Sequence, residues 1–249
     1  MANTIKENLN RNGEVHREYI EYINRIKSVG NKCIEKYITP VLPDGINCSI
    51  KLCDTRDIFD MYINSDYGAV MWKIFNTGVG FPNTIGFNSF IFEEINRIVQ
   101  NGTVMNTICA LYPETNQDGI EITKLTNIQI GIFTEFFDRV FIEHYYGQTD
   151  SYKDNTISKI ETSVRHECGH ALDSLRYFNR PYEYTQKIRM FEVQEEQRYY
   201  HDLGSTRFEV PIEVYFNSPN ERRANNNVGL TTQDMIDSNF SWENKKGVV

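Results

Sequence analysis

The sequence lacks long apolar runs, clusters of basic residues and paired cysteines. No stretch approaches the ~20 apolar residues that a membrane-spanning helix requires, so we expect no membrane segment. The net charge of −8 argues against nucleic acid as the main partner. The five cysteines show no paired-ligand spacing, so we expect neither a disulfide framework nor a four-cysteine zinc site.

The N-terminal residues also lack the apolar run of a signal peptide. We therefore expect synthesis in the cytoplasm, followed either by residence there, by association with a particle or by release without a signal sequence. Free thiols agree with folding in a reducing compartment. No pattern in the sequence indicates an oligomeric state.

Residues 162–173 contain the pattern His166-Glu167-x-x-His170. A helix is expected here, because apolar residues recur at helical spacing: Ile160, Val164, Cys168, Ala171, Leu172, Leu175 and Phe178. Ser158 and Glu161 fit a capping box at its start, and Asn179-Arg180-Pro181 fits its end. Residues four apart share a helix face, so both histidines can bind one ion. The alternative is two solvent-facing histidines on an amphipathic helix.

H-E-x-x-H is a pattern of zinc hydrolases, in which the glutamate is the general base. Glu167 can take a proton from a metal-bound water and return it to a leaving amine. The sequence therefore predicts one Zn²⁺ per chain, bound by His166 and His170, with Glu167 as the catalytic carboxylate.

A catalytic zinc needs a third protein ligand and an open position. Asp173 and Arg176 stand where a metzincin would have glycine and histidine, and no histidine follows His201. The best candidate is Glu221, in a helix expected to begin with Ser218 and Pro219. Two alternatives remain open. Ser218-x-x-Glu221 is itself a capping box, and the other candidate ligands are Glu213, Glu209 and His201.

The segment Glu221-x-x-Ala224-Asn225 resembles the second helix of the gluzincins, where E-x-x-A-D supplies a glutamate ligand and a supporting aspartate. Residues 158–179 and 215–230 are together similar to gluzincin metallopeptidases, the superfamily of thermolysin and neprilysin. The resemblance implies Glu221 as the third ligand and Asn225 as the residue behind a histidine, in place of the aspartate. We also expect Asp173 to support the ligands from behind.

Thermolysin-like enzymes stabilise the oxyanion with a histidine well after the glutamate ligand, and this chain has none there. Tyr215 resembles the tyrosine that precedes the glutamate ligand in lethal-factor-like zincins, which implies a catalytic role for its hydroxyl. The alternatives are Tyr199, Tyr200 and His201, or an ordinary buried aromatic at position 215. Arg222 and Arg223 are expected on a solvated helix face; the alternative is pairing with a substrate carboxylate or with acidic neighbours.

The predicted fold class is α+β and zincin-like, with a small twisted mixed sheet packed on the motif helix and a mostly helical C-terminal part. We expect strands at 46–52, 103–111, 119–125 and 127–133, helices after Asp54 and at 90–99 and 136–144, and loops at 74–90 and 180–217. Residues 1–45 are predicted to form a helical N-terminal extension, broken near Gly30, and 46–249 the zincin-like domain. The alternative is a single domain.

Two functions compete. The first is a zinc-dependent endopeptidase that acts on a protein or peptide substrate, with residues 180–217 walling the cleft. The second is a zincin-fold structural or binding module of a phage or secretion particle, without proteolytic activity. The intact Glu167 favours the first function, because a structural metal site has no use for a base beside the metal.

Overall fold

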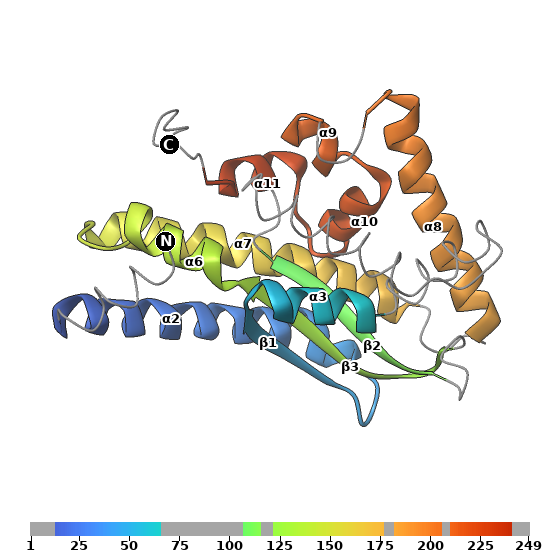
Figure 1. The fold of residues 1–249 in the computed structure, drawn as a ribbon, viewed down its shortest axis with the longest axis horizontal. Helices are drawn as coiled ribbons and strands as arrows, with labels where there is room; N and C mark the ends of the chain where they lie inside the picture. The colour runs from blue at the N-terminus through green and yellow to red at the C-terminus, as the bar shows by residue number, and fades with distance from the viewer. Residues whose placement is uncertain (1–12, 66–106, 116–121, 177–181, 206–209, 241–249) are drawn as a thin grey trace.

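The computed structural model describes residues 13–65, 107–115, 122–176, 182–205 and 210–240. In these ranges the chain is mostly helical and carries one small sheet (Figure 1). The expected mixture of helices and strands is therefore confirmed. The loop predicted at 74–90 and the helix predicted at 90–99 lie outside the described residues. None of the helices in the described ranges is both long and apolar enough to cross a membrane.

The sheet has the strand order β1-β3-β2 and is mixed. Strand β1 (Asn47–Cys53) runs parallel to β3 (Ile122–Phe133), whereas β2 (Thr107–Thr115) pairs antiparallel with β3. Ile128, Ile130 and Ile132 stand at every second position of β3, so their side chains lie on one face of the sheet. All three are fully buried.

The predicted strands 119–125 and 127–133 are one continuous strand from Ile122 on, so the predicted break is wrong. Residues 119–121 lie outside the described ranges. The register against β2 shifts between the pairs Tyr112–Asn127 and Pro113–Leu125, which leaves Thr126 without an opposite residue. A β-bulge adds one residue without ending the pairing, and this disturbs the alternation from which the two strands were inferred.

The N-terminal helix α2 (Gly13–Cys33) continues into a π-helical turn, Ile34–Ile38, and does not break at Gly30. A Cβ on Gly30 would run into the Ile50 side chain of β1. This glycine therefore lets the helix approach the sheet closely. From sequence alone, a glycine that allows close packing looks the same as a glycine that ends a helix. Figure 1 shows α2 lying along α7, with which it packs.

The helix α7 (Asp150–Leu175) begins well before the predicted start at Ser158. The backbone N–H of Lys153 donates to the carbonyl of Thr149 (2.9 Å), and that of Tyr152 donates to its hydroxyl (3.4 Å), so Thr149 caps the helix. Ser158 is an exposed residue within the helix. The predicted helices after Asp54 and at 136–144 are confirmed as α3 (Thr55–Asn64) and α6 (Thr134–His144).

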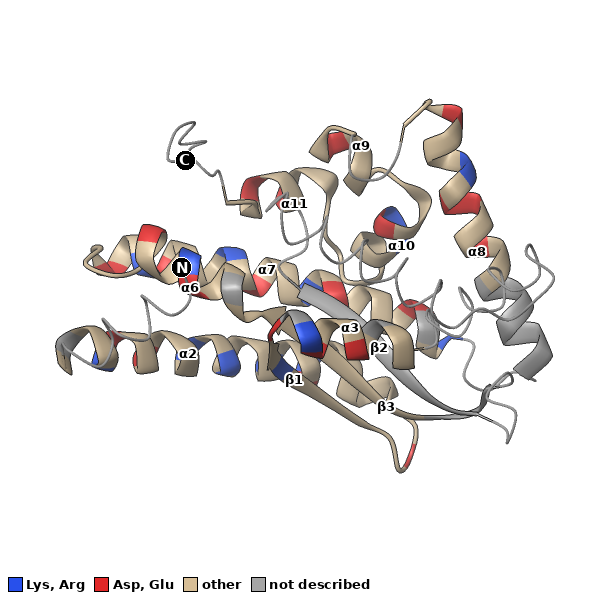
Figure 2. Ribbon diagram, viewed as in Figure 1, with Lys and Arg blue, Asp and Glu red and all other residues tan. Residues whose placement is uncertain are grey.

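The C-terminal part is helical, as predicted, and consists of α8 (Tyr182–Asp202), α9 (Ile212–Phe216), α10 (Pro219–Asn227) and α11 (Thr232–Ser238). The prediction that 180–217 is rich in loops is wrong, since α8 occupies much of that range. Charged residues of both signs follow one another along the described length of α8 (Figure 2). Such a helix shows no apolar stripe from which it could be inferred.

The buried apolar side chains form one cluster that includes Tyr22 of α2, Ile130 of β3 and Val164 of α7. The N-terminal helix therefore shares its core with the sheet and with the motif helix. The boundary near residue 45 stays a prediction.

Candidate metal centre

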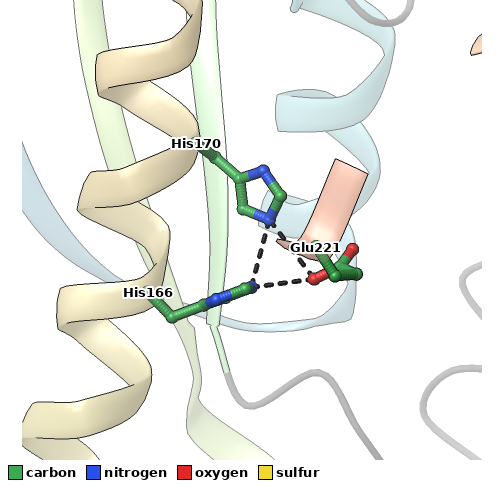
Figure 3. A group of neighbouring side chains, drawn as sticks. All are labelled: His166, His170 and Glu221. Carbon is green, nitrogen blue, oxygen red and sulfur yellow. Dashed lines mark hydrogen bonds and ion pairs between the residues drawn. The ribbon is translucent and has the colours of Figure 1, made fainter. Parts of the chain in front are cut away.

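The two motif histidines lie one turn apart on α7 and point toward α10 (Figure 3). Their Nε2 atoms are 3.1 Å apart. His166 is buried at 4% exposure, and the His170 side chain keeps 20% of its surface accessible. The helix spacing thus places one ring nitrogen from each histidine at a common point, with access retained on the His170 side.

Glu221 of α10 completes this cluster. Its Oε2 atom is 2.8 Å from His166 Nε2 and 3.4 Å from His170 Nε2. Burial alone would raise the pKa of the Glu221 carboxyl, but His170 and His166, when protonated, outweigh burial and hold the pKa well below its usual value. The cluster His166, His170 and Glu221 can hold a metal ion, whose positive charge would take the place of these protons.

Asn225 determines which nitrogen of His166 faces this cluster. The Asn225 Oδ1 atom is 2.8 Å from His166 Nδ1 and accepts its hydrogen. In neutral His166 the Nε2 atom then carries a lone pair, aimed at the Glu221 oxygen. Lone pairs on facing nitrogen and oxygen atoms repel one another unless a proton or a cation lies between them. The cluster thus has the donor set of a cation site.

The helices α7 and α10 approach each other closely at Gly169, which lies between the two histidines. A Cβ on Gly169 would come within 2.7 Å of the carbonyl carbon of Ala224 and 3.0 Å of its Cα. Asn227 Nδ2 also donates to the Gly169 carbonyl (3.0 Å). A glycine at this position therefore allows α10 to bring Glu221 up to the histidines.

The capping box proposed for Ser218 and Glu221 does not form. Ser218 is the N-cap residue of α10 by position, but in the described structure its side chain makes no capping hydrogen bond. Glu196 of α8 instead accepts a hydrogen bond from the backbone N–H of Asn220 (3.2 Å). The first turn of α10 is thus satisfied from another helix, which leaves the Glu221 carboxylate to face the histidines.

Glu196 lies in a buried polar environment beside the hydroxyls of Ser218 and Tyr200. Burial raises the pKa of its carboxyl, and the charge of Glu221 raises it further, while Ser218 and the Asn220 N–H act in the opposite direction. Sequence reasoning missed this residue, because nothing in the local pattern of α8 indicates which face meets α10.

Tyr215 is buried at 6% exposure, and its hydroxyl donates to Oε1 of Glu221 (3.0 Å). The neighbouring Phe216 ring packs edge-on against His166, with ring centroids 5.9 Å apart. The tyrosine predicted to be catalytic is therefore at the cluster, in contact with the carboxylate. The hydroxyl of Tyr199, an alternative, donates to the carbonyl of Val214 (3.1 Å).

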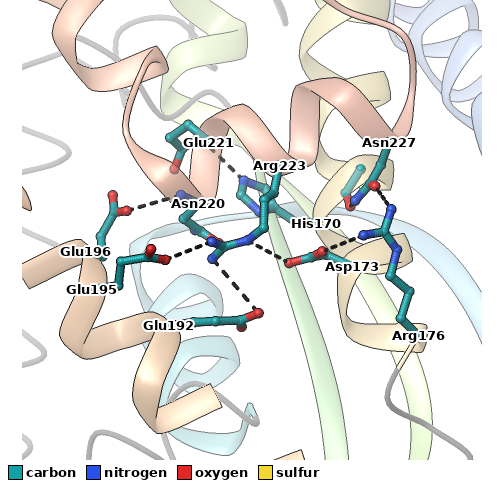
Figure 4. Close-up of polar contacts among 11 residues, drawn as sticks. His170, Asp173, Arg176, Glu192, Glu195, Glu196, Asn220, Glu221, Arg223 and Asn227 are labelled. Atoms are coloured by element: carbon teal, nitrogen blue, oxygen red, sulfur yellow. Dashed lines mark hydrogen bonds and ion pairs between the residues drawn. The ribbon is translucent and has the colours of Figure 1, made fainter. Parts of the chain in front are cut away.

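Asp173 is nearly fully buried, and its carboxylate pairs with Arg223 Nε (3.4 Å) and Arg176 NH1 (3.5 Å) (Figure 4). Arg223 also pairs with Glu195 (3.0 Å) and lies 3.9 Å from Glu192. Asp173 therefore supports the site by tying α7 to α10, a different arrangement from the expected support of a ligand.

Of the two adjacent arginines, Arg222 is exposed as predicted. The solvated face predicted for Arg223 is wrong, and the alternative of pairing with acidic neighbours holds for it. Arg223 reaches sideways to the carboxylates of α8, so its environment depends on a helix that the sequence pattern did not reveal. Among the other candidate ligands, the side chain of His201 is 89% exposed and Glu213 is exposed on α9. Glu209 lies outside the described residues.

Comparisons of the chain with models of protein families, with curated proteins and with solved structures found no match.

Proposed function

We propose that the protein is a zinc-dependent endopeptidase of the gluzincin type. In this proposal His166, His170 and Glu221 bind one Zn²⁺, and Glu167 is the general base. The observation that carries it is the convergence of two imidazole nitrogens and one carboxylate oxygen in a buried cluster.

The spacing of the three atoms suits zinc. They are 2.8, 3.1 and 3.4 Å apart. Ligands about 2.0–2.1 Å from a tetrahedral zinc are separated by roughly 3.3 Å. Two histidines and one glutamate also match the ligand set of catalytic zinc sites that keep a fourth position open. A closed structural site would need a fourth protein ligand.

Bound zinc would lower the pKa of a water molecule and polarise the scissile carbonyl. Glu167, next to His166 in sequence and buried at 6% exposure, would take the proton from the attacking water and return it to the leaving amine. Asn225 would keep His166 in the tautomer that leaves Nε2 free for the metal.

The sheet offers a place for an extended peptide substrate. Among the strands that the structure describes, β2 is at an edge of the order β1-β3-β2, and it packs against α7. A peptide can add to such an edge through main-chain hydrogen bonds. We therefore propose that the substrate is a protein or peptide, bound in extended form along β2.

The test is the zinc content of the purified parent and of Glu221→Ala, measured by elemental analysis. We expect about one zinc per parent chain, as for other catalytic zinc sites, and its loss in the variant because only the histidines remain. Glu213→Ala is the matched control, since it removes an exposed carboxylate from the neighbouring helix. Zinc retained by Glu221→Ala would contradict the ligand assignment. Absence of zinc from a folded parent would favour the binding module over the peptidase.

Asn225 gives a second prediction about the same site. Asn225→Ala removes the acceptor of the His166 Nδ1–H, and we expect zinc affinity to fall about 10- to 100-fold. Asn225→Asp keeps an acceptor and replaces the Nδ2 group, which is buried without an acceptor in the described part of the chain. Its affinity should equal or exceed that of the parent. Competition with a chromogenic chelator measures the zinc affinity of the parent and of both variants. Asn226→Ala is the control, because Asn226 is an exposed neighbour on the same helix.

A further inference from the structure

The two oxygens of the Glu221 carboxylate have different partners. Oε2 faces both histidines, whereas Oε1 accepts a hydrogen bond from the Tyr215 hydroxyl at 3.0 Å. Tyr215 and Glu221 are both buried at 6% exposure, so water does not compete freely for this bond. A buried bond between a hydroxyl and a carboxylate is among the stronger hydrogen bonds in proteins.

The local fold places this hydroxyl firmly. Tyr215 lies in α9, and α10 begins directly after the turn in which the N–H of Ser218 donates to the carbonyl of Tyr215 (3.0 Å). The Tyr215 ring packs edge-on against Phe216, with centroids 5.1 Å apart, and Phe216 packs against His166. The phenol, the carboxylate and the first histidine are thus held as one unit.

A carboxylate can bind a metal through one oxygen or through both. A phenol that donates to Oε1 engages one lone pair of that oxygen and restricts the rotation of the carboxylate, and both effects disfavour a second metal bond through Oε1. It leaves Oε2 as the ligand atom. A hydroxyl bound in this way supports the ligand.

We propose that Tyr215 is a positioning residue for the metal ligand Glu221. Its hydroxyl holds Oε1, selects Oε2 as the single ligand atom and so preserves the open coordination position. This inference rests on the proposed metal site, and it assigns to Tyr215 a role different from the oxyanion stabilisation that the sequence suggested.

The test compares Tyr215→Phe with the parent in zinc affinity, measured by competition with a chelator. We expect affinity about 10- to 100-fold weaker in the variant, because the ligand loses its supporting hydrogen bond. The visible absorption of the Co²⁺-substituted protein should also weaken, since a freed Oε1 allows a higher coordination number. Under saturating zinc, kcat should change by less than about tenfold, because no transition-state contact is removed.

Tyr199→Phe is the matched control. It removes the same atom from a hydroxyl that donates to the Val214 carbonyl, whereas the Tyr215 hydroxyl donates to Glu221. Its zinc affinity and cobalt spectrum should equal those of the parent.

The outcomes separate this inference from the proposed function. Unchanged zinc affinity and an unchanged cobalt spectrum in Tyr215→Phe would overturn the positioning role alone. Unchanged affinity with kcat lowered about 10²- to 10³-fold would overturn it in favour of an oxyanion donor. A folded parent that binds no zinc would overturn the proposed function, and the positioning role with it.

Discussion

Glu167→Gln should lower the rate of peptide cleavage by about 10²- to 10⁴-fold, the contribution usual for a general acid–base residue. Glutamine keeps the size of the side chain but cannot accept the proton of the attacking water. The three residues that hold the metal in our proposal are unchanged, so zinc content should stay the same. The measurement is kcat/KM on a quenched fluorescent peptide library, with zinc content determined on the same samples.

Glu161→Gln is the control for this experiment. It makes the same chemical change on the same helix, at an exposed residue, and should leave cleavage unaffected. Equal rates for Glu167→Gln and the parent would show that Glu167 is not the base. A loss of zinc in Glu167→Gln would instead indicate a structural effect on the site.

Gly169→Ala should destabilise the protein and weaken zinc binding together. Replacing glycine by alanine within a helix normally favours folding by up to about 1 kcal/mol. At this position the new Cβ would be 2.7 Å from the Ala224 carbonyl carbon, and backbone atoms cannot rotate aside. Overpacking of this kind costs about 1–3 kcal/mol, so we expect a lower free energy of unfolding in urea. Moving α10 away also moves Glu221 from the histidines, so zinc affinity should fall.

Gly30→Ala tests whether the effect is specific to the metal centre. This glycine is also buried within a helix, but its Cβ would meet the end of the Ile50 side chain, which can change rotamer. We expect the free energy of unfolding to change by less than about 1 kcal/mol, with zinc affinity as in the parent. If Gly169→Ala behaves like Gly30→Ala, the close approach of α7 and α10 does not position Glu221.

The sequence predicted those parts of the site that depend on spacing within one helix. His166 and His170 share a face because they are four residues apart, and Glu221 and Asn225 share a face of α10 for the same reason. The candidate ligand Glu221 was found through its similarity to a known motif. The structure brings it to both histidines, with Tyr215 beside it.

The parts that could not be predicted depend on contacts between distant segments. Ser158-x-x-Glu161 reads the same at a helix start and on an exposed face within a helix, so it gave the wrong start for α7. Whether Ser218 or Glu196 satisfies the first turn of α10 is decided by α8, which has no apolar periodicity. The burial of Arg223 could not be predicted either, because its partners Glu192 and Glu195 belong to α8.

The contacts that hold α8 to the rest of the fold include two of different chemical character. Tyr200 joins the apolar core, whereas Glu195, with 42% of its side chain exposed, is held by its ion pair with Arg223. Dissolved salt screens exposed charges but does not weaken apolar contacts. Rising ionic strength therefore weakens the ion pair between Glu195 and Arg223 but not the packing of Tyr200 in the core. Salt thus acts on the contact between α8 and α10, the helix that carries Glu221, while the core stays intact.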